Sequence, residues 1–283
     1  MKRTVLLMFL IVSAHDVSSC ESPQPLSGTV TVPVCLTDGP DCRPAGKVLY
    51  EYTEAQPDDP ASFSIALQTS PWRMYGPDNR IITVAEVADI LRPQLEPKHK
   101  HVELFGSWTG GSYSAEMPSL ASKLSKALDG FPVTGKDGFL WMDKKGGMRT
   151  TKQAFTLREG GGPYSVPTGE EVFIPLVVGW AAGLEDRIGK DDHEMMLLAG
   201  VGSDVFLLCP DGALATFERA GKMGSAIGAY NASLIRLERN HKGDRDAALK
   251  LLERAMQLGD GKASLLLKAM RQKAAVPAAD EKK

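Results

Sequence analysis

The sequence predicts an α/β fold: a small, mostly parallel sheet with flanking helices, an added β-hairpin before it and a C-terminal α-helical repeat after it. Strand and helix patterns alternate from Ser62 to Met142, and strands separated by one-helix crossovers form parallel, right-handed units. From Lys222 onwards the apolar residues follow a helical period. With 283 residues, 43% of them hydrophobic, the chain is long enough to bury a sizeable core.

The N-terminus has the features of a secretory leader. The basic pair Lys2-Arg3 precedes an apolar run at residues 5–14, which is too short to span a bilayer. The run leads to Val17-Ser18-Ser19-Cys20, which resembles the bacterial lipobox. The resemblance implies a lipoprotein signal peptide at residues 1–19 and a lipid on the cysteine. Because Glu21 follows, it also implies a place on the outer membrane facing the periplasm. Cleavage by the ordinary signal peptidase and a buried N-terminal helix are the alternatives.

The segment 20–61 is predicted to hold a tether and a β-hairpin. Alternating apolar residues mark Thr29–Val34 and Lys47–Thr53 as strands, and Thr37–Asp41 has the composition of a turn. A polar stretch with several prolines then leads to the next unit at Ser62.

The four cysteines are sorted by their places in the chain. With Cys20 acylated, Cys35 and Cys42 flank the predicted turn and could close a disulfide in the oxidising periplasm. Cys209 is then left over. Its apolar neighbours favour a small buried side chain over a reactive thiol.

The α/β domain is predicted to span residues 62–221. Thr83 and Glu86 form a capping box that starts a helix ended by Pro93, and a second helix begins near Pro118. A long loop is expected at Thr69–Arg80. Asp211-Gly212 is expected to join Val205–Cys209 to Leu214–Phe217 as a hairpin. The remaining expected elements are strands at Phe63–Leu67, Val102–Phe105, Phe131–Thr134, Phe139–Met142 and Val172–Trp180.

Residues 222–273 are predicted to form a helical repeat, and 274–283 a disordered, solvated tail. Gly224-Ser225-Ala226 recurs as Gly261-Lys262-Ala263, an offset of 37 residues. Together with its small alanines and capping glycines, the segment resembles the tetratricopeptide-like repeat of the Sel-one type. A lone helical hairpin packed on the α/β domain is the alternative.

A glycine-rich turn at Gly106–Ser112 follows the strand that begins at Val102, where an open parallel sheet places its ligands. This strand and turn, the helix after them and the strands at 131–141 resemble caspase-like peptidase folds and related domains of bacterial toxin systems. In that family a cysteine follows this strand and a histidine follows the preceding one. Here Ser107 and Gln68-Thr69-Ser70 stand at those places. The resemblance therefore implies the fold without its catalytic residues.

Two groups of residues have side chains suited to catalysis or metal binding. Ser107 is a candidate nucleophile, with Asp137 or a distant histidine as its base, but the sequence around it is not a Gly-x-Ser-x-Gly elbow, so capping of the turn is favoured. Asp191–Glu194 is the densest cluster of possible metal ligands. Because adjacent residues rarely point at one ion and acids are favoured where helices begin, a helix start is favoured. No metal and no cofactor are predicted.

The loops expected above the sheet carry a candidate partner-binding surface. Aromatic rings and arginine supply large contact area at low entropy cost. The same rings could instead be buried lids on the core. The residues are Trp72, Arg73, Tyr75, Trp108, Thr109 and Tyr113.

The charge balance limits the class of partner. Lys plus Arg, 33, nearly equals Asp plus Glu, 35, so no excess of positive charge is present to neutralise phosphates, and a nucleic-acid partner is not expected. The sequence predicts a cell-envelope lipoprotein, attached to the membrane through its N-terminal lipid, that binds an unidentified protein, with an immunity-type role against a secreted toxin as one form. A periplasmic hydrolase using Ser107 and a structural envelope lipoprotein are the alternatives.

Overall fold

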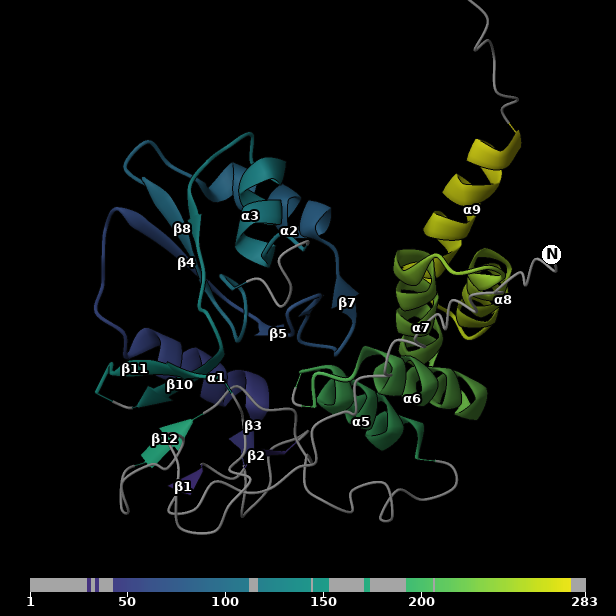
Figure 1. Ribbon diagram of the computed structural model, residues 1–283, viewed down its shortest axis with the longest axis horizontal. Helices are drawn as coiled ribbons and strands as arrows, with labels where there is room; N and C mark the ends of the chain where they lie inside the picture. The colour runs from purple at the N-terminus through teal and green to yellow at the C-terminus, as the bar shows by residue number, and fades with distance from the viewer. Residues whose placement is uncertain are drawn as a thin grey trace, which may run out of the picture.

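The computed structural model describes residues 30–31, 34–35, 43–111, 117–143, 145–152, 171–173, 192–205 and 207–275. It is a mixed α/β unit with a small parallel sheet, followed by a C-terminal stretch of helices (Figure 1). The predicted signal peptide, Cys20 and most of the predicted tail lie outside the described residues. None of the described helices is long and apolar enough to cross a membrane.

The parallel sheet consists of β4 (Ser62–Ala66), β8 (His101–Phe105) and β9 (Val133–Thr134), in the order β4-β8-β9. Both neighbouring pairs are parallel, so this prediction is confirmed. Helices α2 (Val84–Leu91) and α3 (Leu120–Ala127) cover the same side of the sheet (Figure 1). A short 3-10 helix, η1 (Arg92–Gln94), follows α2. The buried residues between helices and sheet include Val87, Leu91, Val102, Leu104, Leu120 and Leu124.

The predicted helix starts are confirmed by their hydrogen bonds. Thr83 and Glu86 form both bonds of a capping box at the start of α2. At α3 the Ser119 hydroxyl accepts a hydrogen bond from the Ser122 amide. Gly130 follows this helix with φ 88°, a conformation that glycine adopts without strain. Local sequence therefore sets the ends of both helices.

A second, mixed sheet lies beside the first. Its order is β1 (Val30–Thr31), β12 (Glu171–Phe173), β10 (Phe139–Asp143) and β11 (Met148–Thr151). The predicted strand at 139–142 is thus present, but it belongs to this sheet and not to the parallel one. Two further short strands, β2 (Val34–Cys35) and β3 (Arg43–Pro44), pair with each other in parallel. Of the strand predicted at 172–180, only its first two residues lie within the described chain.

The predicted N-terminal hairpin is wrong, because its second strand is a helix, α1 (Ala45–Glu54). The alternating tyrosines suggested one buried strand face. In the helix they point to different sides: Tyr52 is buried with Phe105, Leu140 and Met142, whereas Tyr50 is 61% exposed. The β-forming preference of these residues is weak, and burial of Tyr52 against two sheets outweighs it.

The segment predicted as one long loop is instead a small antiparallel sheet of three strands. These are β5 (Gln68–Thr69), β6 (Met74–Tyr75) and β7 (Ile81–Ile82), paired in that order. We call the segment from Gln68 to Ile82 the meander. It lies on the side of the α/β unit that faces the C-terminal helices (Figure 1).

Helices begin well before the predicted boundary at Lys222. The described helices of this part are α5 (His193–Val205), α6 (Pro210–Met223), α7 (Ala226–Arg239), α8 (Asp244–Gln257) and α9 (Gly261–Ala275). The hairpin predicted around Asp211-Gly212 is wrong, because these residues form the first turn of α6 behind Pro210, a favoured first helical residue. The Asp191–Glu194 cluster does start a helix, since Asp192 Oδ1 accepts a hydrogen bond from the Met195 amide.

The helices repeat with an offset of 35 residues, not the predicted 37. Ser225 caps α7 by accepting from the Gly228 amide, and Asp260 caps α9 by accepting from the Ala263 amide. The cap residues' own amides donate to Ala220 and Ala255, which are related by the same offset. The left-handed glycines before the caps, Gly224 and Gly259, are related in the same way. The pairs α6–α7 and α8–α9 are therefore equivalent units.

Candidate functional site

The carboxyl ends of β4 and β8, where a ligand was expected, are closed by the chain itself. Thr69 Oγ1 donates a 2.7 Å hydrogen bond to the carbonyl of Ser107, so the segments after the two strands do meet. The approach is tight, because a Cβ at Gly106 would lie 2.4 Å from Thr69 Oγ1. The predicted turn is therefore a packed junction between strands.

Ser107 and Thr109 are anchors within this junction. Ser107 is 2% exposed, and its hydroxyl accepts a 3.1 Å hydrogen bond from the Leu140 amide. Thr109 is fully buried and donates to the carbonyls of Leu104 and Gly106. Neither hydroxyl faces open space, so the structure places Ser107 as a structural residue that holds β10 against the turn.

The aromatic residues of the predicted binding surface lie inside the molecule. Tyr75 and Trp108 are buried, and Trp72 packs against the same cluster. The Trp108 ring meets Phe139 edge to face at 5.7 Å. Helical residues complete the cluster, among them Val201, Val205, Leu214, Phe217 and Ile235. The alternative of buried lids therefore describes these rings, while Tyr113 lies outside the described residues.

Arg73 is the centre of a buried ionic cluster. Its guanidinium lies 2.6 Å from Asp204 of α5 and 2.7 Å from Glu238 of α7. The hydroxyls of Ser70 and Tyr75 both donate to Asp204 Oδ2 at 2.8 Å. Burial and the charge of Asp204 raise the pKa of Tyr75. For Arg73, burial lowers the pKa, but the charges of Asp204 and Glu238 outweigh burial and raise it.

Further polar contacts extend this interface to α9. Arg80 of the meander lies 2.6 Å from Asp260, the N-cap of α9, and its guanidinium stacks over Tyr230. Asn231 of α7 accepts from the Ile81 amide and donates to the Asn79 carbonyl. The meander thus contacts α5, α7 and α9. The surface predicted for a partner is in fact the interface between the two parts of this chain.

One more ion pair joins the parts at the rim of the interface. Lys262 of α9 lies 2.7 Å from Glu86 in the first turn of α2. Partial burial raises the pKa of Glu86, but the hydrogen bonds from Lys262 and Thr83 outweigh burial and lower it. The same carboxylate therefore caps α2 and holds α9.

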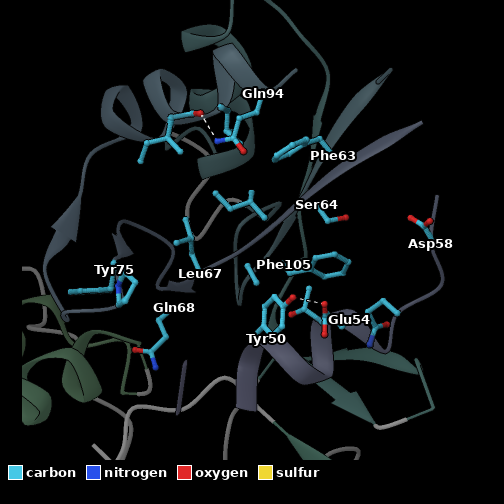
Figure 2. A pocket seen from close by; sticks show the side chains of 18 of the residues that line it. Tyr50, Glu54, Asp58, Phe63, Ser64, Leu67, Gln68, Tyr75, Gln94 and Phe105 are labelled. Carbon is cyan, nitrogen blue, oxygen red and sulfur yellow. Dashed lines mark hydrogen bonds between the residues drawn. The ribbon is translucent and has the colours of Figure 1, made fainter. Parts of the chain in front are cut away.

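An open groove of about 1030 Å³ lies along the side of β4 that is not paired with β8 (Figure 2). Helix α1 borders it on one side and α2 with η1 on the other, and the β6–β7 turn closes one end. Its lining includes Phe63, Ile65, Leu67 and Phe105. Two large exposed apolar residues, Tyr50 and Ile90, stand on the bordering helices, 61% and 48% exposed. The groove therefore combines an apolar lining with an accessible mouth.

The groove is acidic at the end nearest α1. Glu54, Asp58 and Asp59 line it, and no Lys, Arg or His is among its lining residues. The hydroxyl of Tyr50 donates a hydrogen bond to Glu54, and this bond raises the pKa of Tyr50. Within the described residues, no group of three or more His, Cys, Asp or Glu could hold a metal ion. The groove is therefore suited to bind an apolar segment that carries positive charge.

Sequence reasoning missed this groove. Glu54, Asp58 and Asp59 form a visible acidic cluster, but they lie in the polar stretch before Ser62, which the sequence predicts only as a connection. Tyr50 lies in the segment Lys47–Thr53, which the alternating pattern predicts as a strand. What could have indicated a surface is the next helix, where Ile90 falls outside the apolar stripe formed by Val87, Ala88 and Leu91.

The structure also corrects the prediction that Cys209 is unpaired, because Cys209 is disulfide-bonded. The predicted pairing of Cys35 with Cys42 involves side chains outside the described residues. If Cys20 carries the lipid, only Cys35 or Cys42 can pair with Cys209, and those two cannot then pair with each other.

A family model described as Domain of unknown function (DUF8616) matches residues 40–150, which is less than half of the chain. The match includes α1, the parallel sheet and α2, and thus all of the lining of the groove except Leu198. No curated protein matches the chain. No solved structure matches it.

Proposed function

We propose that this protein is a lipid-anchored cell-envelope protein that binds a protein partner in the groove between α1, β4 and α2. The observation that carries the proposal is the groove itself, which has apolar side chains along β4, is accessible and is acidic at one end. Exposed apolar patches bordered by polar residues mark protein interaction sites. Arg73, Tyr75, Trp108 and Thr109, which the sequence predicts for that role, are buried, so the groove is the better candidate.

Two features support the envelope location. The N-terminal sequence resembles a lipoprotein signal peptide that ends at Cys20. Cys209 is disulfide-bonded, and disulfides persist in oxidising compartments such as the periplasm. Globomycin should block processing, and Cys20→Ala should release the protein from the membrane. Processing that ignores globomycin would contradict lipidation.

The helical part is proposed to be a tetratricopeptide-like repeat that binds another part of its own chain. Its 35-residue period and its helix pairs support this proposal. Repeat solenoids present extended faces to their partners. Here α5, α7 and α9 use polar groups to hold the meander. We therefore propose that the helices position the α/β unit. If the protein has an immunity-type role, the toxin would bind in the groove.

We also propose that the α/β unit has a caspase-like fold. It is supported by the parallel pairing of β4 and β8 and by the contact between Thr69 and Ser107, which stand where that family has its histidine and cysteine. The buried, hydrogen-bonded state of Ser107 argues against the hydrolase alternative. Binding, and not turnover, is the activity to test.

Capture of a partner by two matched variants tests the proposed function. Ile90→Glu places a charge at the mouth of the groove, and Leu265→Glu makes the same type of change on α9, where Leu265 is 71% exposed. The full chain and both variants are each expressed in cells, and the proteins that contact them in the cell envelope are captured by crosslinking. We expect a saturable partner with the parent chain and with Leu265→Glu, but not with Ile90→Glu. A partner lost only in Leu265→Glu would place the binding site on the helices. If no saturable partner is found, the alternative of a structural envelope lipoprotein is favoured.

A further inference from the structure

The strand beside the groove is an edge strand. In the three-stranded parallel sheet, β4 pairs with β8 on one side, and no other described strand pairs with β4. Its opposite side borders the groove, whose lining includes every residue from Phe63 to Gln68 (Figure 2). An edge strand presents a row of backbone donors and acceptors on which another chain can pair.

The register shows which backbone groups face the groove. The Leu67 amide donates to the carbonyl of Phe105, and the Ala61 carbonyl accepts from the Lys100 amide, so odd-numbered residues direct their backbone groups towards β8. In a strand the direction alternates from one residue to the next. Ser64 and Ala66 therefore direct their amides and carbonyls towards the groove. The Ser62 amide is already bonded to the Asp59 carbonyl, so the free row starts at the Ser62 carbonyl.

The edge lacks the features that usually block pairing. The sequence of β4, Ser-Phe-Ser-Ile-Ala, contains no proline and no charged residue. Helices α1 and α2 stand on both sides of it (Figure 2). These walls would obstruct a second sheet, whereas a single extended chain needs only the width of one strand, about 5 Å. The shape therefore selects one peptide segment over sheet-to-sheet contact.

The charge of the groove selects the type of peptide. Glu54, Asp58 and Asp59 lie at one end, and no cation among the lining residues balances them. Phe63, Ile65 and Leu67 offer apolar contacts along the strand. A segment that fits must be extended, apolar at alternate positions and rich in lysine or arginine.

We propose that a basic, extended segment of the partner pairs as an added strand with the free edge of β4, using the backbone groups of Ser64 and Ala66. This inference rests on the proposed function and specifies how the partner is bound. In strand addition, main-chain hydrogen bonds supply affinity and side-chain pockets supply specificity. Binding should therefore depend on the backbone amides of Ser64 and Ala66 and tolerate many sequences of the same charge pattern.

The test uses the full chain in detergent and a fluorescent peptide of alternating valine and lysine. Ser64→Pro removes the amide that faces the groove but keeps the bonds to β8, and proline is tolerated at such edge positions. Ser64→Ala is the matched control, because it keeps the amide. We expect Ser64→Pro to weaken binding by about tenfold, the effect of losing one hydrogen bond and leaving its acceptor on the peptide unpaired. Ser64→Ala should change it by less than about twofold. Equal weakening by both variants, or no binding by the parent chain, would overturn strand addition.

A second pair of variants tests the charge. Asp58→Lys reverses an exposed acid at the groove, and Asp246→Lys makes the same change on the exposed face of α8. We expect Asp58→Lys to weaken binding several-fold and to flatten its salt dependence, with no effect of Asp246→Lys. A valine–glutamate peptide that binds as well as the valine–lysine peptide would contradict the basic segment.

Thermal unfolding will show whether Ser64→Pro folds. If it does not, peptides with a modified backbone test strand addition instead. Peptides methylated on the backbone nitrogens of alternate residues cannot donate along one edge. We expect one of the two methylation registers to lose binding by about tenfold and the other to keep it. Equal binding by both registers would overturn strand addition. The proposed function would still stand if Ile90→Glu abolished partner capture, so the two failures are distinguishable.

Discussion

The carboxyl ends of β4 and β8 and the free side of β4 belong to the same small sheet, but only the second is open. At the strand ends, Thr69, Ser107 and Thr109 bond to the chain's own backbone, and the meander holds three helices. Along the free side, the groove leaves Tyr50 and Ile90 exposed. The difference teaches that the usual ligand position of a parallel sheet is filled by internal packing, and that the accessible surface of this sheet lies along the edge of β4.

The largest effect is expected from opening the covered end at Asp204. This fully buried carboxylate accepts from Arg73, Ser70 and Tyr75. Asp204→Ala leaves the Arg73 charge buried beside only Glu238, and breaking a buried pair costs about 3–5 kcal/mol. Denaturant unfolding measures the loss. Glu238→Gln, at a position whose side chain is 45% exposed, should cost less than about 1 kcal/mol. A loss in Asp204→Ala as small as that expected for Glu238→Gln would mean that the cluster does not hold the covered end.

The next effect concerns the disulfide at Cys209, which lies between two of the covering helices. Removing a native disulfide costs about 2–5 kcal/mol, so Cys209→Ala should lower the free energy of unfolding by that amount. Reduction of the parent protein should bring its stability close to that of the variant. Peptide mapping without reductant should recover Cys209 in a crosslinked pair. A free thiol at Cys209 in protein isolated from envelopes would exclude the bond.

Ser107→Ala should have an intermediate effect on stability and none on binding. It leaves the buried Leu140 amide without its acceptor, at a cost of about 1–3 kcal/mol. Binding of the valine–lysine peptide should be unchanged, because Ser107 is not among the residues that line the groove. Ser64→Ala, at an exposed position, is the stability control. Loss of a hydrolytic activity in Ser107→Ala without loss of stability would favour the hydrolase alternative.

The smallest effect is a pH-dependent one at the rim of the interface. The folded state lowers the pKa of Glu86 below the unfolded value of about 4.3. Its stabilising contribution is therefore complete above that value and is lost as the pH falls through the folded pKa. At pH 7, Glu86→Gln should cost about 0.5 kcal/mol, and the cost should shrink below about pH 4. Asp89→Asn on the exposed side of α2 is the control. A cost that stays constant down to pH 3 would contradict the ion pair with Lys262.

Local signals predicted the elements that depend on neighbouring residues. The Thr83–Glu86 capping box fixed the start of α2, and the strands β4 and β8 followed from their apolar runs. The helices after Lys222 followed from their 3.6-residue period. The failures came where two patterns fit the same residues. In α1, tyrosines at alternate positions fit a strand, and around Asp211-Gly212 a turn motif fit a helix start.

The partner-binding surface predicted from aromatic residues and Arg73 is instead packed against helices of the same chain. Nothing local in Arg73 distinguishes a partner's carboxylate from that of Asp204, which is 131 residues away in the sequence. The open groove was missed because its acids lie before β4 and Ile90 lies on α2, and only folding brings them together.

The sequence by itself determined the parallel strand pair, the capped helices and the helical C-terminal part, because each depends on period or caps within a short stretch. Tertiary structure alone decided that the helices cover the carboxyl ends of the sheet and that the edge of β4 stays open. The covered end depends on the buried pairing of Arg73 with Asp204. A buried charge is stable only where its partner is brought to it, and that is a property of the folded chain.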